Sequence, residues 1–189
     1  MLIHISLNKK MPSKKKKRMA GKTKLIQIIR KVGAPEVPKI KLTGILESPE
    51  QDLFSFSYGK NSVLRNILEH LGNSSINIRF MSKSSYANNH ATARICIDSK
   101  YHEKVKEILS RKDVITSIDR LIYQPGVRIL SIYPFKGDPK IAMRFFDALN
   151  SKNIEVLATN TATSVISCVI PSRKLPLAKQ QLKSAFTFG

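Results

Sequence analysis

The apolar positions of the chain repeat at a constant offset from residue 39 onward. One set has the spacing of a single apolar helix face, and its members are Val63, Leu64, Ile67, Leu68 and Leu71. The same spacing returns 78 residues later at Ile141, Ala142, Phe145, Phe146 and Leu149. Each set predicts an amphipathic helix that covers a core.

The same offset of 78 residues continues beyond the helix into a segment with the alternation of a strand. Ile76 and Ile78 alternate as in a strand, and Ile154 and Val156 match them. A polar insertion at residues 84–90 then reduces the offset to 73, at which Ile97 corresponds to Ile170. A match that crosses two kinds of periodicity indicates an internal duplication.

Each copy therefore has the pattern strand, helix, strand, strand, helix. In copy one we expect strands at 53–58, 75–83, 91–98 and 114–123, with helices at 62–72 and 101–111. In copy two we expect strands at 127–134, 153–161 and 164–170, with helices at 139–150 and 174–185. The predicted fold class is α+β, with two ferredoxin-like βαββαβ units whose helices cover one face of an antiparallel sheet.

Copy two lacks a fourth strand, because only four residues follow its last helix. The segment 39–46 is an unassigned strand with Ile40, Leu42 and Leu46 on one face. We expect it to complete copy two, since an unpaired apolar edge invites aggregation. Copy one is then inserted in copy two. The predicted domains are 1–38 (basic tail and linker), 53–124, and 39–46 plus 127–189.

Composition supports a folded core and a reducing compartment. The chain has 189 residues, of which 42% are hydrophobic, and only two cysteines. No apolar run reaches the ~18 residues that a membrane span needs. We therefore expect a cytoplasmic protein without a membrane partner.

The charge is concentrated at the N-terminus. The net charge is +20, and residues 1–41 hold 13 of the 33 basic residues but one acid, Glu36. Such a segment repels itself and buries little, so we expect a disordered basic tail. Three interpretations stay open: a solubilising arm, a contact for nucleic acid or acidic surfaces, or a chain that starts at Met11 or Met19.

The order of several short motifs resembles the tandem ACT regulatory region of aspartate kinases. These motifs are Leu42-Thr43-Gly44-Ile45, Ile76-Asn77-Ile78, Phe145-Phe146-Asp147-Ala148-Leu149, Val165–Ile170 and Leu182–Phe186. The resemblance covers about residues 39–188. It implies a regulatory role in amino-acid biosynthesis, a homodimer with sheets side by side, and allosteric binding of a lysine- or threonine-like effector.

The kinase domain that precedes this region in the family has no counterpart here, because a tail of about 38 residues is too short to fold into one. The resemblance thus implies a free-standing, non-catalytic regulatory subunit that acts on a kinase-type catalytic partner, or an orphan relative of the family. It implies no cofactor.

By the same resemblance, the effector-binding residues are those of the first loop and the second strand of copy one: Gly59, Lys60, Asn61, Ser62, Lys83 and Ser84. They depart from the family pattern, which has an acidic residue and Pro-Gly in the loop and Gln-Asn on the strand. Lys140 likewise replaces the loop glycine of copy two. Because lysine repels an α-ammonium group, a small anion is the alternative effector.

The sequence offers few candidates for metal binding, nucleophilic catalysis or base stacking. The four histidines are expected at the surface and form no cluster at metal-ligand spacing. Cys96 and Cys168 lie one residue out of register between the copies, so we expect core positions on opposite faces of their sheets. The strands 91–97 and 165–170 hold no aromatic residue for stacking bases. The alternative function is therefore nucleic-acid binding through the basic tail alone.

Overall fold

The computed structural model describes residues 38–59, 62–86 and 90–189. The predictions made for the basic tail fall on residues 1–37, which lie outside the described residues. In the described part of the chain no helix is long and apolar enough to cross a membrane.

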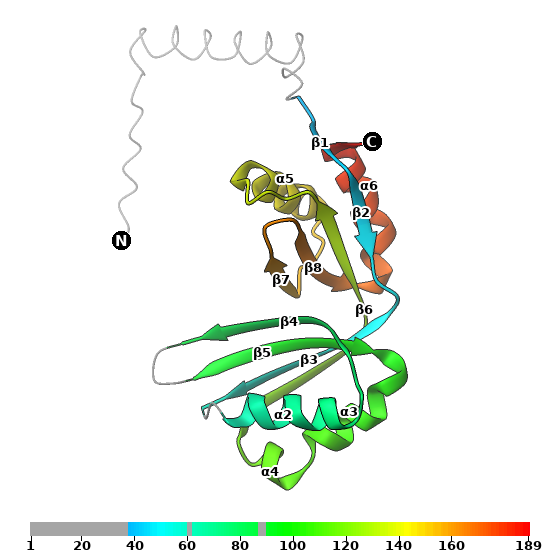
Figure 1. The fold of residues 1–189 in the computed structure, drawn as a ribbon. Helices are drawn as coiled ribbons and strands as arrows, with labels where there is room; N and C mark the ends of the chain where they lie inside the picture. Colours follow the sequence, from blue (N-terminus) through cyan, green and yellow to red (C-terminus); the bar gives the residue numbers. More distant parts are fainter. Residues whose placement is uncertain (1–37, 60–61, 87–89) are drawn as a thin grey trace, which may run out of the picture. The chain divides into compact units, whose positions relative to one another are not determined.

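Copy one is a four-stranded antiparallel sheet with helices on one face (Figure 1). Its strands are β3 (Gln51–Tyr58), β4 (Ile78–Ser85), β5 (Ala91–Asp98) and the first half of β6 (Ile118–Tyr133), in the order β4-β5-β3-β6. Its helices are α2 (Ser62–Asn73), α3 (His102–Leu109) and α4 (Lys112–Ile115), with a 3-10 turn at Ser99–Tyr101. Phe54, Phe56 and Tyr58 alternate onto the helix-covered face and are buried.

Copy two has the same strand order, completed from the N-terminal side. Its elements are the second half of β6, α5 (Pro139–Asn150), β7 (Ala158–Thr161), β8 (Ile166–Pro171), α6 (Leu175–Ala185) and β9 (Phe186–Phe188). The segment before copy one forms β1 (Ile40–Leu42) and β2 (Gly44–Glu47). β2 pairs antiparallel with β6, and β1 pairs parallel with β9.

These pairings confirm the predicted fold class, in which one ferredoxin-like unit is inserted in the other. Residues 39–46 pair with copy two, as expected, although a bend at Thr43 divides them into two strands. The Thr43 amide hydrogen-bonds to the Tyr133 carbonyl at 2.9 Å across this bend. The exact domain boundaries stay a prediction.

The duplication is confirmed by burial on matched helix positions. In α2 the buried residues are Val63, Ile67 and Leu71, and in α5 they are Ile141, Phe145 and Leu149. The helix ends match as well, because Ser75 and Asn153 both have positive φ, at 53° and 49°. A left-handed residue after a helix lets the chain reverse onto the core.

These helix ends explain two errors in the strand predictions. The strand predicted at 75–83 begins at Ile78, and the strand predicted at 153–161 begins at Ala158. In both copies the first apolar residue after the helix stays bonded to it. The amides of Ile76 and Ile154 reach the carbonyls of Leu71 and Leu149 at 2.9 and 3.1 Å.

A larger error concerns the junction between the copies. The pattern predicts separate strands at 114–123 and 127–134, whereas the structure has helix α4 and then one strand, β6, of 16 residues. Val114 turns inward from α4 into the core of copy one. Pro125 and Gly126 do not end β6, because a bulge opposite Gln51 and Leu53 leaves them out of the ladder.

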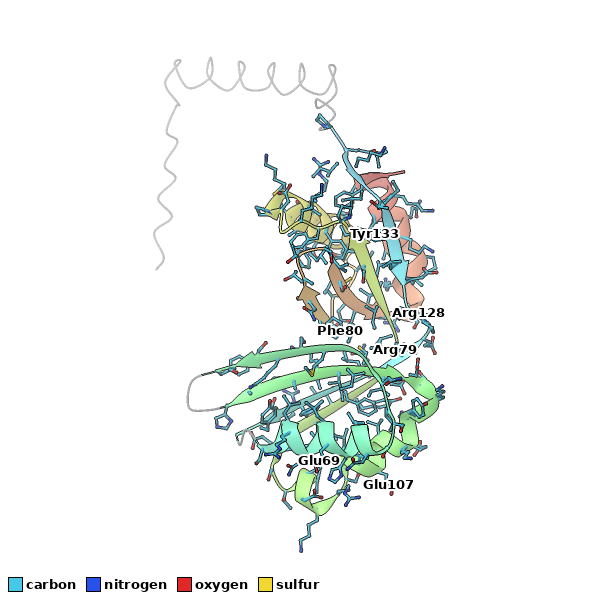
Figure 2. The ribbon with its side chains drawn as sticks, in the orientation of Figure 1. Glu69, Arg79, Phe80, Glu107, Arg128 and Tyr133 are labelled. Carbon is cyan, nitrogen blue, oxygen red and sulfur yellow. The ribbon has the colours of Figure 1, made fainter. Side chains whose placement is uncertain are left out.

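The two sheets are therefore continuous through β6, and their helix-free faces meet near this bulge. A small apolar cluster forms there from Leu53, Phe80, Cys96, Val127, Ala158 and Val169. Figure 2 shows Phe80 and Arg128 near this junction and Tyr133 at the far end of β6. The Arg128 guanidinium donates to the Ser48 carbonyl at 2.8 Å, which ties β6 to the link between β2 and β3.

Candidate effector site

The strand register places the predicted loop and strand residues at one end of the copy-one sheet. Tyr58 pairs with Ala91, which pairs in turn with Ser85. Gly59 follows Tyr58 directly, and a side chain at Gly59 would meet the His90 ring at 3.6 Å. Ser62 begins α2, whereas Lys60 and Asn61 lie outside the described residues.

Lys83 and Ser84 are neighbours on β4 that point to opposite faces of the sheet. Lys83 pairs with Ala93, whose side chain is in the helix-covered core, and Ser84 pairs with Thr92 on the helix-free face. Both residues line one cavity, and the lining includes neither Gly59 nor Ser62. The structure thus brings the loop and the strand to the same end of the sheet without joining them in one pocket.

The cavity lies between β4 and β5 of copy one and the β7 region of copy two. Its volume is about 560 Å³, and polar residues make up most of its wall: Ser82, Lys83, Ser84, Arg94, Thr159, Asn160 and Thr161. The Asn160 amide donates to the Met81 carbonyl at 3.1 Å, so one side chain connects the two copies at its edge.

The corresponding loop of copy two is a helix cap. The Asp138 carboxylate accepts a hydrogen bond from the Lys140 amide at 2.8 Å, and Pro139 occupies the first turn of α5. Lys136 and Gly137 both have positive φ and turn the chain into this cap. The loop is therefore shaped to start a helix.

A polar cluster that the sequence analysis missed lies at the opposite end of the copy-one sheet. The buried carboxylate of Asp52 accepts hydrogen bonds from Ser99 Oγ at 2.9 Å, His102 Nδ1 at 2.9 Å and Tyr123 Oη at 3.1 Å. Next to it, Gln51 Nε2 donates to Asp98 Oδ1 at 2.7 Å. Asp52 and its donors are 47 to 71 residues apart in sequence, so no local sequence pattern predicts this cluster.

His102 corrects the expectation of four surface histidines. Its ring lies against Tyr123 with 4.5 Å between centroids, and its side chain is only 22% exposed. Ser99 hydrogen-bonds to the carboxylate and not to the imidazole, so no hydroxyl is in place to be deprotonated by His102. The cluster therefore holds the start of α3 against β3 and β6.

The same cluster makes Tyr123 resistant to ionisation. Desolvation and the hydrogen bond to the Asp52 carboxylate raise the pKa of Tyr123 to about 12. Because the folded chain holds this proton more tightly than the unfolded chain, the contribution to stability is complete below pH ~10 and is lost as the pH rises toward 12.

We expect Tyr123→Phe to remove one late-ionising tyrosine from the alkaline end of a titration followed by tyrosinate absorbance. The variant should also lose less stability between pH ~10 and 12 than the wild type. Tyr86→Phe is the matched control, because the Tyr86 side chain is exposed. A titration curve that Tyr123→Phe leaves unchanged at its alkaline end would contradict the role given to Asp52.

The cysteines occupy core positions, as predicted. Cys96 faces the helix-free cluster and Cys168 the helix-covered core of copy two, so they lie on opposite faces of their sheets. Burial raises the pKa of both thiols to about 12, which disfavours the nucleophilic thiolate. Among the described residues there is also no group of three His, Cys, Asp or Glu side chains that could hold a metal ion.

Residues 135–186 match the family model of the ACT domain, and they cover α5 to β9 of copy two. No curated protein matches the chain.

Among solved structures, the regulatory subunit of aspartate kinase from Thermus thermophilus is similar over 98% of its own chain and 77% of this one. Its TM-score is 0.68 at 16% identity. A structure of aspartokinase alpha and beta subunits has a TM-score of 0.67 at 19% identity, over 97% of that chain and 76% of this one.

Escherichia coli aspartokinase III, in complex with lysine and aspartate, has a TM-score of 0.57 at 12% identity. The match covers 79% of this chain and 34% of that one. Residues 135–186 are thus similar to the ACT domain, and the chain has the fold seen in solved regulatory subunits of aspartate kinase. The comparisons do not support the nucleic-acid alternative.

Proposed function

We propose that this protein is a non-catalytic regulatory subunit that dimerises, binds an amino-acid-like effector and controls a kinase-type partner. The observation that carries the proposal is the extent of the structural match. The regulatory subunit from Thermus thermophilus is matched over 98% of its length and 77% of this chain.

Dimerisation is proposed through an open edge of the copy-one sheet. The first half of β6 pairs with β3 on one side only, and Leu121, Ile122 and Tyr123 are exposed there by 39%, 44% and 37%. Covering an exposed apolar edge with a second copy of the chain is favourable, because it removes apolar surface from water. Ile118 at the start of β6 pairs with Tyr58, so the second chain would lie beside the end that carries the candidate loop.

The effector is proposed to contact the loop Gly59–Ser62 and the strand positions Lys83 and Ser84. Escherichia coli aspartokinase III is described in complex with lysine and aspartate, which supports an amino acid as the ligand class. The exposed Lys83 favours the carboxylate of such a ligand. The partner is proposed from the structure of aspartokinase alpha and beta subunits. Both cysteines are free thiols, which is why the cytoplasm stays the proposed compartment.

We expect the full chain to be a dimer by light scattering and to melt at a higher temperature with its amino acid than without it. At an effector concentration of 100 times Kd the added stability is about 2.7 kcal/mol. For a chain of this length that corresponds to roughly 5–10 °C. The measurement is a thermal shift screen against the amino acids.

The variant Lys83→Gln should reduce the shift, whereas Lys152→Gln, which removes an equal charge from the end of α5, should preserve it. If no amino acid changes the melting temperature of an intact dimer, the effector part of the proposal fails. A monomer at every concentration tested would contradict the dimer.

A further inference from the structure

We propose that the cavity between the two copies is a binding site for a small oxyanion, a phosphate or a carboxylate group held by Arg94. This inference goes beyond the proposed function. The cavity lies within one chain, between helix-free sheet faces, and neither Gly59 nor Ser62 contributes to its lining.

Positive charge without a counter-charge is the first argument. The lining contains no aspartate or glutamate, and it includes Arg94 on the helix-free face, whereas the Lys83 side chain points to the other face of the sheet. Arg94 is half-buried in the middle of β5, and no described residue forms an ion pair with it. A guanidinium that is partly removed from water and has no partner favours an anion that it can bind through two parallel N–H groups.

Hydroxyl groups surround the guanidinium on both neighbouring strands. Arg94 pairs with Ser55 on β3 and with Ser82 on β4, and residues that pair directly across strands point to the same face. Ser84 follows on that face, opposite Thr92. Ser82 and Ser84 line the cavity, and no described group hydrogen-bonds to their hydroxyls, so each can donate to a bound oxygen.

Copy two supplies the opposite wall. β7 contributes Thr159, Asn160 and Thr161, and the Asn160 amide already reaches β4 at the Met81 carbonyl. The volume of about 560 Å³ is in the range of small-molecule sites and exceeds what a bare phosphate needs. The ligand is therefore an organic molecule whose anionic group lies at Arg94 and whose remainder lies along β7.

Such a ligand would stabilise the contact between the copies, because both walls belong to the same cavity. The other contacts include the apolar cluster around Phe80 and the Asn160 hydrogen bond. Occupancy would thus favour one arrangement of copy one against copy two, a coupling that regulation requires.

The test measures binding of inorganic phosphate and of succinate to the full chain by calorimetry and thermal shift, at an ionic strength kept constant with sodium chloride. At least one of the two anions should raise the melting temperature above the chloride control, and the responding anion identifies the class. Arg94→Gln should weaken its Kd by at least about tenfold, because a charge-assisted hydrogen bond is lost. Ser82→Ala should weaken the Kd by a smaller factor.

Arg120→Gln is the matched control. Arg120 pairs with Ser57 and so lies on the same face as Arg94, but outside the cavity lining. The Kd of the Arg120→Gln variant for the anion should stay within about twofold of the wild-type value, since diffuse attraction between separated charges is weak. Equal weakening by Arg94→Gln and Arg120→Gln, or no response to either anion beyond chloride, would overturn the site.

The outcome is separable from that of the proposed function. A response to phosphate or succinate that depends on Arg94 supports the cavity even when every amino acid fails. A response to an amino acid that depends on Lys83 and not on Arg94, with no response to either anion, supports the proposed function and overturns the cavity.

Discussion

Replacing Phe145 with alanine is expected to lower the free energy of unfolding by about 3–5 kcal/mol. Phe145 is fully buried in α5, at the centre of the copy-two core between Ile141 and Leu149. Its ring packs edge-on against Phe146 with 5.4 Å between centroids. The cost combines the lost burial with the cavity that a rigid sheet and two helices cannot fill, and chemical denaturation measures it.

Phe146→Ala is the natural control, because the neighbouring ring is only partly buried and should cost clearly less. Ile67→Ala at the matched position of copy one is expected to cost about 2–5 kcal/mol. Each variant should shift a single unfolding transition, since β6 belongs to both sheets and β2 precedes copy one. Two transitions, of which Phe145→Ala moves only one, would contradict the coupling of the copies.

Asp52→Ala should destabilise the protein by about 3 kcal/mol, the largest effect expected of a polar residue. The carboxylate is 3% exposed and accepts three hydrogen bonds, from Ser99, His102 and Tyr123. Its removal leaves those donors partly buried without an acceptor, and each such group has a desolvation cost. The measurement is the shift in denaturant midpoint at neutral pH with an unchanged slope.

The control for Asp52 is Asp119→Ala, which removes another aspartate that pairs with a histidine. Asp119 Oδ2 lies 3.3 Å from His90 Nδ1, but both side chains are more than half exposed. Exposed pairs contribute little, so a much smaller shift is expected. Equal shifts for the two variants would mean that the Asp52 hydrogen bonds do not stabilise the fold beyond an ordinary surface pair.

Local periodicity predicted the helices well, because burial on one face of a helix leaves a regular mark in the sequence. The helix expected at 139–150 has those bounds, and the one expected at 62–72 extends by a single residue. Strand ends were less accurate. A left-handed residue at Ser75 or Asn153 delays the strand after each helix, and neither serine nor asparagine announces such a conformation as glycine would.

The candidate site was predicted only in part, because its residues come from strands that are distant from one another in sequence. The resemblance singled out Lys83 and Ser84, which line the cavity, but it gave no sign of Arg94 on β5 or of Asn160 on β7. These residues meet because β5 lies between β3 and β4 and because the two sheets face each other beyond the β6 bulge. Neither the strand order nor the facing of the two sheets can be inferred from residues that are neighbours in sequence.

By itself, the sequence determined the duplication, the class of fold and the borrowed strand, since each follows from apolar period or from the count of available strands. Tertiary structure alone decided that β6 is one strand shared by both sheets, that Asp52 accepts from three donors, and that a cavity lined by Arg94 lies between the copies. The physical reason is the distance along the chain over which each effect acts. Burial on one face of an element acts through nearby residues, whereas sheet continuity and polar clusters depend on segments that approach only when the chain folds.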